Sequence, residues 1–99
     1  MEEFFTLAEA DAVNCAHLLP IKDVRDERGN LLIPKGAYAY VSGIHALDAS
    51  SALVGIDFSG ILELDENHRD TGRFKFLPKL FLVNKTFLQE NFRVRKVQP

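Results

Sequence analysis

The sequence predicts a small, mainly β domain: a barrel of five to six short antiparallel strands, with a short N-terminal helix and a helical turn before the last strand. Three observations predict it. Apolar residues form many short runs, turn residues separate these runs, and helical patterning is confined to the first 16 residues and to a stretch near residue 88. Many short strands with close turns in 99 residues are typical of small barrels or sandwiches.

Length and composition predict one soluble domain over residues 1–99, because domains commonly have roughly 100–150 residues. Hydrophobic residues make up 46% and charged residues 26% of the chain, which is ordinary for globular proteins. We expect residues 1–16 to form a helical extension and residues 17–97 to form the barrel.

A helix is expected over residues 6–16, "TLAEADAVNCA". Thr6 and Glu9 have the spacing of a capping box, in which each side chain satisfies a free backbone N–H of the first turn. The apolar side of this helix is thin, and short isolated helices are marginal in water. The helix must therefore pack against the rest of the domain.

Strands follow the helix. Residues 17–24 form an apolar run interrupted by Pro20, which suits an edge strand or a bulge. A polar turn leads to a short apolar return at 31–33, and "IPKG" has the residues of a tight turn. The alternation in "AYAYVSGI" predicts the next strand, at 37–44.

Residues 52–58 alternate in the same way, and a Ser-Gly pair separates them from "ILEL" at 61–64. We therefore predict a hairpin of these two runs with a two-residue connection. Residues 65–73 are strongly polar and are expected to form a surface loop.

The last part of the chain is expected to be extended, then helical, then extended again. Pro78 prevents 74–83 from forming one continuous strand. Residues 84–92 have the pattern of one or two helical turns, with either Asn84 or Thr86 as the cap. Residues 92–97 form the final strand.

Three pieces of the chain resemble the SH3-like barrels, in particular those of bacterial or phage-like subunits and of translation or transcription modules. They are "GNLLIPKGAYAYV" at 29–41, "ALVGIDFSGILEL" at 52–64, and "TFLQEN" directly before the last strand. The resemblance spans about residues 19–97. Ala39 stands where many such barrels have glycine, and the N-terminal helix is additional.

Tyr38 and Tyr40 are the candidate binding residues within this resemblance. Successive side chains of a strand point to opposite faces. The resemblance implies that Val41 faces the core, and Ala37 and Ala39 are then inside as well. The two tyrosines lie on the outer face, either under the N-terminal helix or open to a partner.

Catalysis is not expected. Cys15 and His17 are two residues apart at a helix end, so their side chains diverge, and the chain has no C-x-x-C, P-loop or G-x-S-x-G. We interpret Cys15 as a small buried thiol, His17 as a surface imidazole and His68 as part of a solvated loop. No catalytic residue, metal or cofactor is assigned.

Basic residues are concentrated near the C-terminus. Residues 73–99 contain seven Lys or Arg and one Glu, although the whole chain has a net charge of −2. Basic residues interleaved with aromatic ones are typical of surfaces that bind RNA or DNA. The candidate nucleic-acid residues are Arg73, Phe74, Lys75, Lys79, Lys85 and Lys96.

The main functional prediction is a protein-interaction module or small regulatory subunit without catalytic activity, and nucleic-acid binding is the alternative. The residues expected to contact a protein partner are Tyr38, Tyr40, Arg93 and Arg95. An edge strand also offers a route to a homo-oligomer. No apolar run approaches the roughly 18 residues that span a bilayer. With one cysteine and no signal-peptide pattern, we expect a cytoplasmic protein without a membrane partner.

Overall fold

The computed structural model describes residues 2–95 and is mainly β, with 48% strand and 15% helix. Its main element is a five-stranded antiparallel sheet with the order β8-β5-β4-β1-β9. The strands of this sheet are β1 (His17–Pro20), β4 (Ala39–Ala46), β5 (Ala52–Phe58), β8 (Lys79–Val83) and β9 (Phe92–Arg95). A closed barrel is not confirmed, because within the described residues this ladder ends at β8 on one side and at β9 on the other.

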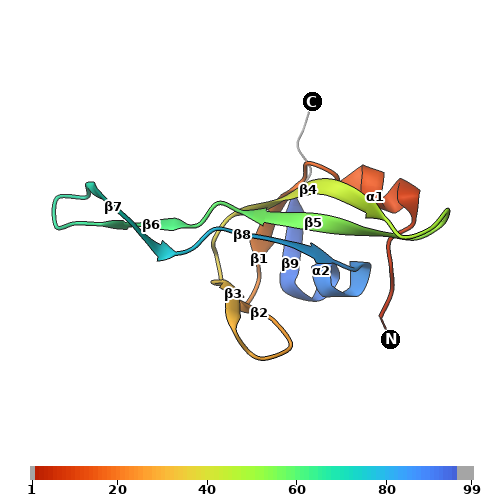
Figure 1. Cartoon of the computed structure of the whole chain (residues 1–99), viewed down its shortest axis with the longest axis horizontal. Helices are drawn as coiled ribbons and strands as arrows, with labels where there is room; N and C mark the ends of the chain where they lie inside the picture. The colour runs from red at the N-terminus through yellow and green to blue at the C-terminus, as the bar shows by residue number, and fades with distance from the viewer. Residues whose placement is uncertain (1, 96–99) are drawn as a thin grey trace.

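Two hairpins accompany the sheet. The first consists of β2 (Val24–Arg25) and β3 (Leu31–Ile33), and the second of β6 (Ile61–Leu64) and β7 (Asp70–Phe76). Figure 1 shows the second hairpin extending away from the rest of the molecule. We call residues 59–78, which contain it, the arm.

The predicted hairpin of 52–58 with 61–64 is wrong. β5 pairs with β8, so that Phe58 lies opposite Lys79, while β6 pairs with β7. The physical reason is burial: β8 brings Val83 to the inner side of the sheet, whereas β6 has no buried residue. Gly60, at φ 83°, directs the chain into the arm, and a Cβ there would lie 2.8 Å from the carbonyl oxygen of Phe76.

The prediction of a surface loop at 65–73, which depended on polarity alone, is wrong in part. The segment predicted as a surface loop, 65–73, is exposed, but β7 already begins at Asp70. The interruption at Pro78 is confirmed, because it lies between the end of β7 and the start of β8.

The N-terminal helix α1 (Leu7–Val13) begins with the expected capping box. The Thr6 hydroxyl accepts a hydrogen bond from the Glu9 N–H at 3.1 Å, and the Glu9 carboxylate accepts one from the Thr6 N–H at 3.0 Å. The helix is shorter than the predicted 6–16, because the backbone leaves the helical region at Asn14 and reaches φ 65° at Cys15.

The second helix is α2 (Lys85–Asn91), and Asn84 is its cap. The Asn84 side chain accepts a hydrogen bond from the Phe87 N–H at 2.8 Å, so the cap is Asn84 and not Thr86. The Thr86 hydroxyl instead accepts one from the Glu3 N–H at 2.7 Å. Neither helix in residues 2–95 has the length and apolarity that a membrane crossing needs.

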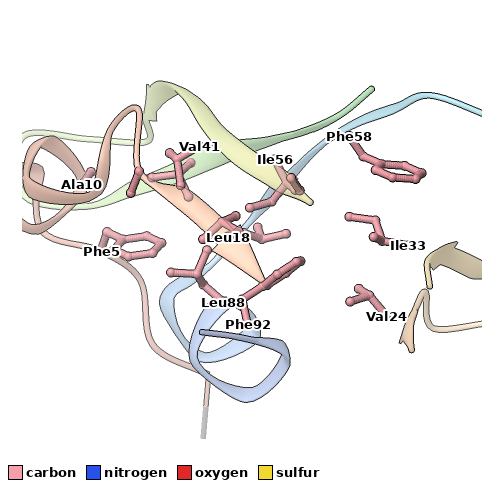
Figure 2. Packing of buried hydrophobic residues seen from close by; sticks show 14 of the residues in the cluster. Phe5, Ala10, Leu18, Val24, Ile33, Val41, Ile56, Phe58, Leu88 and Phe92 are labelled. Carbon is pink, nitrogen blue, oxygen red and sulfur yellow. The ribbon is translucent and has the colours of Figure 1, made fainter. Parts of the chain in front are cut away.

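The core lies on the inner face of the main sheet, where the helices and the β2–β3 hairpin contribute to it. Figure 2 shows Leu88 of α2 close to Phe5, Leu18 and Phe92. At the other end of the cluster Val24 and Ile33 of the small hairpin lie near Phe58. Ala10 of α1 and Leu88 of α2 are buried in this core, and neither helix covers the outer face of the sheet.

Candidate functional site

Tyr40 of β4 and Tyr38, directly before this strand, have the predicted orientation. Ala39 and Val41 are buried, whereas Tyr38 is 61% and Tyr40 43% exposed. The cause is the period of two in a strand, which sends alternate side chains to opposite faces. Helix α1 does not cover the tyrosines, because its buried residue, Ala10, belongs to the core on the inner side.

The strand register brings residues that are distant in the sequence together around Tyr40. His17 is the cross-strand partner of both Tyr40 and Arg95, and Asp57 is the partner of both Tyr40 and Leu80. Directly opposed residues in a sheet share one face. They form the row Arg95–His17–Tyr40–Asp57–Leu80, and we call the exposed side of the sheet that carries this row the tyrosine face.

A shallow pocket of about 390 Å³ lies on this face. It is lined by His17, Tyr38, Ala39, Tyr40, Ser59 and Arg95. Three of the four predicted partner-binding residues therefore meet in one pocket. The fourth, Arg93, is exposed two positions before Arg95 on β9 and points to the same side, next to Leu19 of β1.

The polar groups of the tyrosine face differ in whether they have a partner within the described residues. The Tyr40 hydroxyl donates a hydrogen bond of 2.8 Å to the Asp57 carboxylate. That bond, together with the negative charge of Asp57 and a small loss of solvation, raises the pKa of Tyr40 above its ordinary value of 10.0. Neither Arg93 nor Arg95 forms an ion pair with another residue in 2–95. Both side chains are exposed.

The sequence did not assign His17, Asp57 and Leu80 to the site. The phase of β1 could have placed His17 on the outer side, because its neighbour Leu18 is apolar and fully buried. Nothing in the local sequence indicates that β1 lies between β4 and β9, or that β8 lies beside β5. These contacts depend on strand order and not on spacing along the chain.

The candidate nucleic-acid residues are not brought together. Arg73, Phe74 and Lys75 lie on β7 of the arm, and Lys79 begins β8. Lys85 lies at the start of α2, where its ammonium group forms an ion pair with Glu9 of α1. Lys96 is outside the described residues.

The arm that carries three of these residues also carries acidic ones. Its described residues include four carboxylates against three Lys or Arg. The carboxylates are Glu63, Asp65, Glu66 and Asp70. Phosphate binding depends on positive charge that is not neutralised by carboxylates nearby. The arm therefore carries one more acidic than basic side chain.

The interpretation of Cys15 as a buried thiol is wrong, because the positive φ at the end of α1 turns its side chain out to solvent. His17 is exposed as expected. Across residues 2–95, no three His, Cys, Asp or Glu side chains gather in an arrangement that could hold a metal ion.

Comparisons of the chain with protein-family models, with curated proteins and with solved structures found no match. The functional inference therefore depends on the geometry of the tyrosine face.

Proposed function

We propose that this protein is a non-catalytic protein-interaction module, acting as a small regulatory subunit in the cytoplasm, and that it binds its partner on the tyrosine face. The observation that carries the proposal is the meeting of Tyr38, Tyr40 and Arg95 in one exposed pocket. Tyrosine and arginine are the residue types enriched at the centres of protein interfaces.

The exposure of these side chains supports the proposal. Tyr38 and Tyr40 are 61% and 43% exposed, and Leu80, at the end of the same row, is 72% exposed. Large apolar side chains gathered on one exposed face are typical of interaction sites. The Tyr40 ring is also held in place by its bond to Asp57, so little conformational entropy is lost on binding.

We also propose that the main sheet belongs to an SH3-like architecture. In support, the last strand, β9, lies beside the first, β1, and a short helix directly precedes β9. A long connection between β1 and β4 contains the β2–β3 hairpin, and the arm is an extended connection between β5 and β8. On this proposal, the five strands and the hairpins curve around the single core.

The test is the double substitution Tyr38→Ser and Tyr40→Ser in the full chain. Partners are captured on immobilised protein from a lysate of the native cell and quantified by mass spectrometry. We expect the proteins that the unsubstituted chain retains to be reduced about tenfold or more, because truncation of interface tyrosines removes a large share of the binding energy. Both side chains are exposed, so we expect the melting temperature to fall only slightly, through loss of the Tyr40–Asp57 hydrogen bond.

The matched control is Leu62→Ser with Leu64→Ser, which removes two exposed apolar side chains from the arm and leaves the tyrosine face intact. Capture that survives the tyrosine substitutions, or that is lost equally in the control, would contradict the proposal. A large fall in the melting temperature of the tyrosine variant would show that the pair stabilises the fold.

The nucleic-acid alternative predicts a different result, which is measured by oligonucleotide binding to the same variants. An oligonucleotide bound at low salt should dissociate steeply as salt rises, with the logarithm of the affinity linear in the logarithm of salt concentration. Such binding, lost in Arg73→Ala with Lys75→Ala and kept in the tyrosine variant, would replace the protein-interaction proposal.

A further inference from the structure

The two edges of the main sheet present different side chains. Within residues 2–95, β8 and β9 each pair with one neighbouring strand only. β9 exposes Arg93 and Arg95, whereas β8 exposes Leu80 at 72% and Leu82 at 51%. An edge strand offers unpaired N–H and C=O groups to another chain, and charged side chains are the usual protection against such pairing. β9 has this protection on its exposed face, and β8 does not.

Two copies of strand β8 can pair in the antiparallel direction with complementary side chains opposite each other. A twofold axis through Phe81 places Leu80 of one copy opposite Leu82 of the other, and the reverse. Apolar pairs directly opposed across two strands stabilise a sheet. The same operation on β9 places Arg93 opposite Arg95, and like charges in opposed positions are destabilising. Self-pairing is therefore favoured at β8 and disfavoured at β9.

Charge complementarity supports the same register. Lys79, at the start of β8, points to the same side as Phe81 and Val83. At the other end of β8, Leu82 and Val83 line a pocket of about 360 Å³ together with three carboxylates. These are Glu2, Asp26 and Glu27, and no Lys or Arg of the described chain lines this pocket.

In the twofold register Lys79 of each copy lies opposite Val83 of the other. Its ammonium group is then brought to the rim of the acidic pocket. The contact occurs twice, once at each end of the paired strands, because a twofold interface repeats every contact.

We propose that two copies of this chain pair through β8 and form a continuous ten-stranded sheet. The twofold axis of an antiparallel strand pair is perpendicular to the sheet, so the tyrosine faces of both copies lie on the same side. Leu80 and Leu82 of the two chains join them into one surface. This inference does not depend on what the tyrosine face binds, but a dimer would present two such sites to one partner and so increase the apparent affinity.

The first test is the mass of the full chain in solution, measured by light scattering and by sedimentation equilibrium over a wide range of concentration. We expect a species of twice the chain's 11.2 kDa that dissociates on dilution. Leu80→Lys with Leu82→Lys places cations opposite cations across the twofold axis, and we expect the dimer Kd to rise about tenfold or more. Lys79→Glu is expected to weaken the dimer through repulsion by the acidic pocket.

The matched control is Leu62→Lys with Leu64→Lys on the arm, which adds the same charge at residues of similar exposure and should leave the Kd unchanged. A chain that stays monomeric at every concentration would overturn the proposal. So would a dimer that the arm substitutions dissociate and the β8 substitutions do not.

A second measurement keeps the register testable even if a charged variant folds poorly. In a Cys15→Ser background, Leu80→Cys with Leu82→Cys places thiols in opposed positions across the twofold axis. Mild oxidation should then give a covalent dimer that reducing agent dissociates. A Leu62→Cys with Leu64→Cys chain in the same background should give none, and efficient cross-linking there in place of β8 would contradict the proposal.

Discussion

Tyr40 shows how one hydrogen bond can determine both the position and the chemistry of a surface residue. Its ring is 43% exposed, yet its hydroxyl is held by Asp57 of the neighbouring strand at 2.8 Å. The carboxylate accepts a hydrogen bond from the protonated phenol and repels the phenolate, so both effects raise the pKa of Tyr40. The bond ties the hydroxyl of Tyr40 to β5, and His17 lies opposite Tyr40 on the other neighbouring strand, β1.

This bond predicts a titration that can be measured at one residue. In a Tyr38→Phe chain Tyr40 is the sole tyrosine, since the sequence contains two. We expect its ultraviolet titration midpoint to lie above 10.0, and Asp57→Asn to move the midpoint down. Ionisation is disfavoured in the folded state, so the bond stabilises the fold below the unfolded pKa and this stability is lost as pH rises through the folded pKa. An unchanged midpoint in the Asp57→Asn chain would show that the carboxylate does not act on Tyr40.

At the scale of elements, one carboxylate connects the two helices. Glu9 accepts a hydrogen bond from the Thr6 N–H within α1, and its other oxygen binds the Lys85 ammonium group at the start of α2. The hydrogen bond from Lys85, followed by that from Thr6, lowers the pKa of Glu9 below its ordinary 4.5. A short helix such as α1 depends on contacts of this kind because its own propensity is insufficient.

The Glu9 carboxylate, shared by the two helices, predicts how the free energy of unfolding changes as the pH falls. Because the folded pKa of Glu9 is lowered, its contribution is present above the unfolded pKa and is lost as pH falls through the folded pKa. Glu9→Gln should therefore unfold at lower urea than the unsubstituted chain at neutral pH, and the difference should shrink as pH falls below about 4.5. Exposed Glu66→Gln on the arm serves as the control. A difference that stays constant with pH would exclude the ionised pair as its cause.

At the scale of the whole molecule, a compact sheet carries a projecting arm. The molecule extends 51 Å in its longest direction and 20 Å in its shortest, and the arm accounts for its elongated shape (Figure 1). Of the arm's side chains, Ile61 and Phe76 pack against the core, and β6 and β7 contain no buried residue. Two-stranded hairpins are marginal by themselves in water, so the arm is the least supported part of the fold.

The rest of the molecule should therefore fold without the arm, residues 59–78. Phe58 and Lys79 are opposed across β5 and β8, so an Asn-Gly turn in place of residues 59–78 closes these strands directly. We expect cooperative urea unfolding with a free energy of unfolding lower by about 2 kcal/mol, from the lost contacts of Ile61 and Phe76. The slope of the free energy of unfolding against urea concentration should change little. This slope follows the surface buried on folding, and the arm buries little of it. A chain that loses cooperative unfolding would show that the arm is required for the core.

Several features were predictable because each depends on a few neighbouring residues. The capping box of α1 needs only Thr6 and Glu9 at the correct spacing. The break at Pro78 follows from its missing N–H. The boundaries were less well predicted: helix α1 ends at Val13, before the expected Ala16, because the chain turns at Asn14 and Cys15 to bring β1 beside β4.

The sequence by itself determined the capping of α1, the break at Pro78 and the alternation of side chains along β4. The period of two put Ala39 and Val41 on one side and Tyr38 and Tyr40 on the other. Which side is buried was implied only by the resemblance to SH3-like barrels, and Ala39 and Val41 are buried in the structure. The tertiary structure alone decided which strands are neighbours, since pairing is chosen by the burial that each candidate strand offers over the whole core. That choice put β8 beside β5 and sent β6 into the arm. It also aligned residues from four other strands in one row with Tyr40, because contacts between strands depend on register and not on distance along the chain.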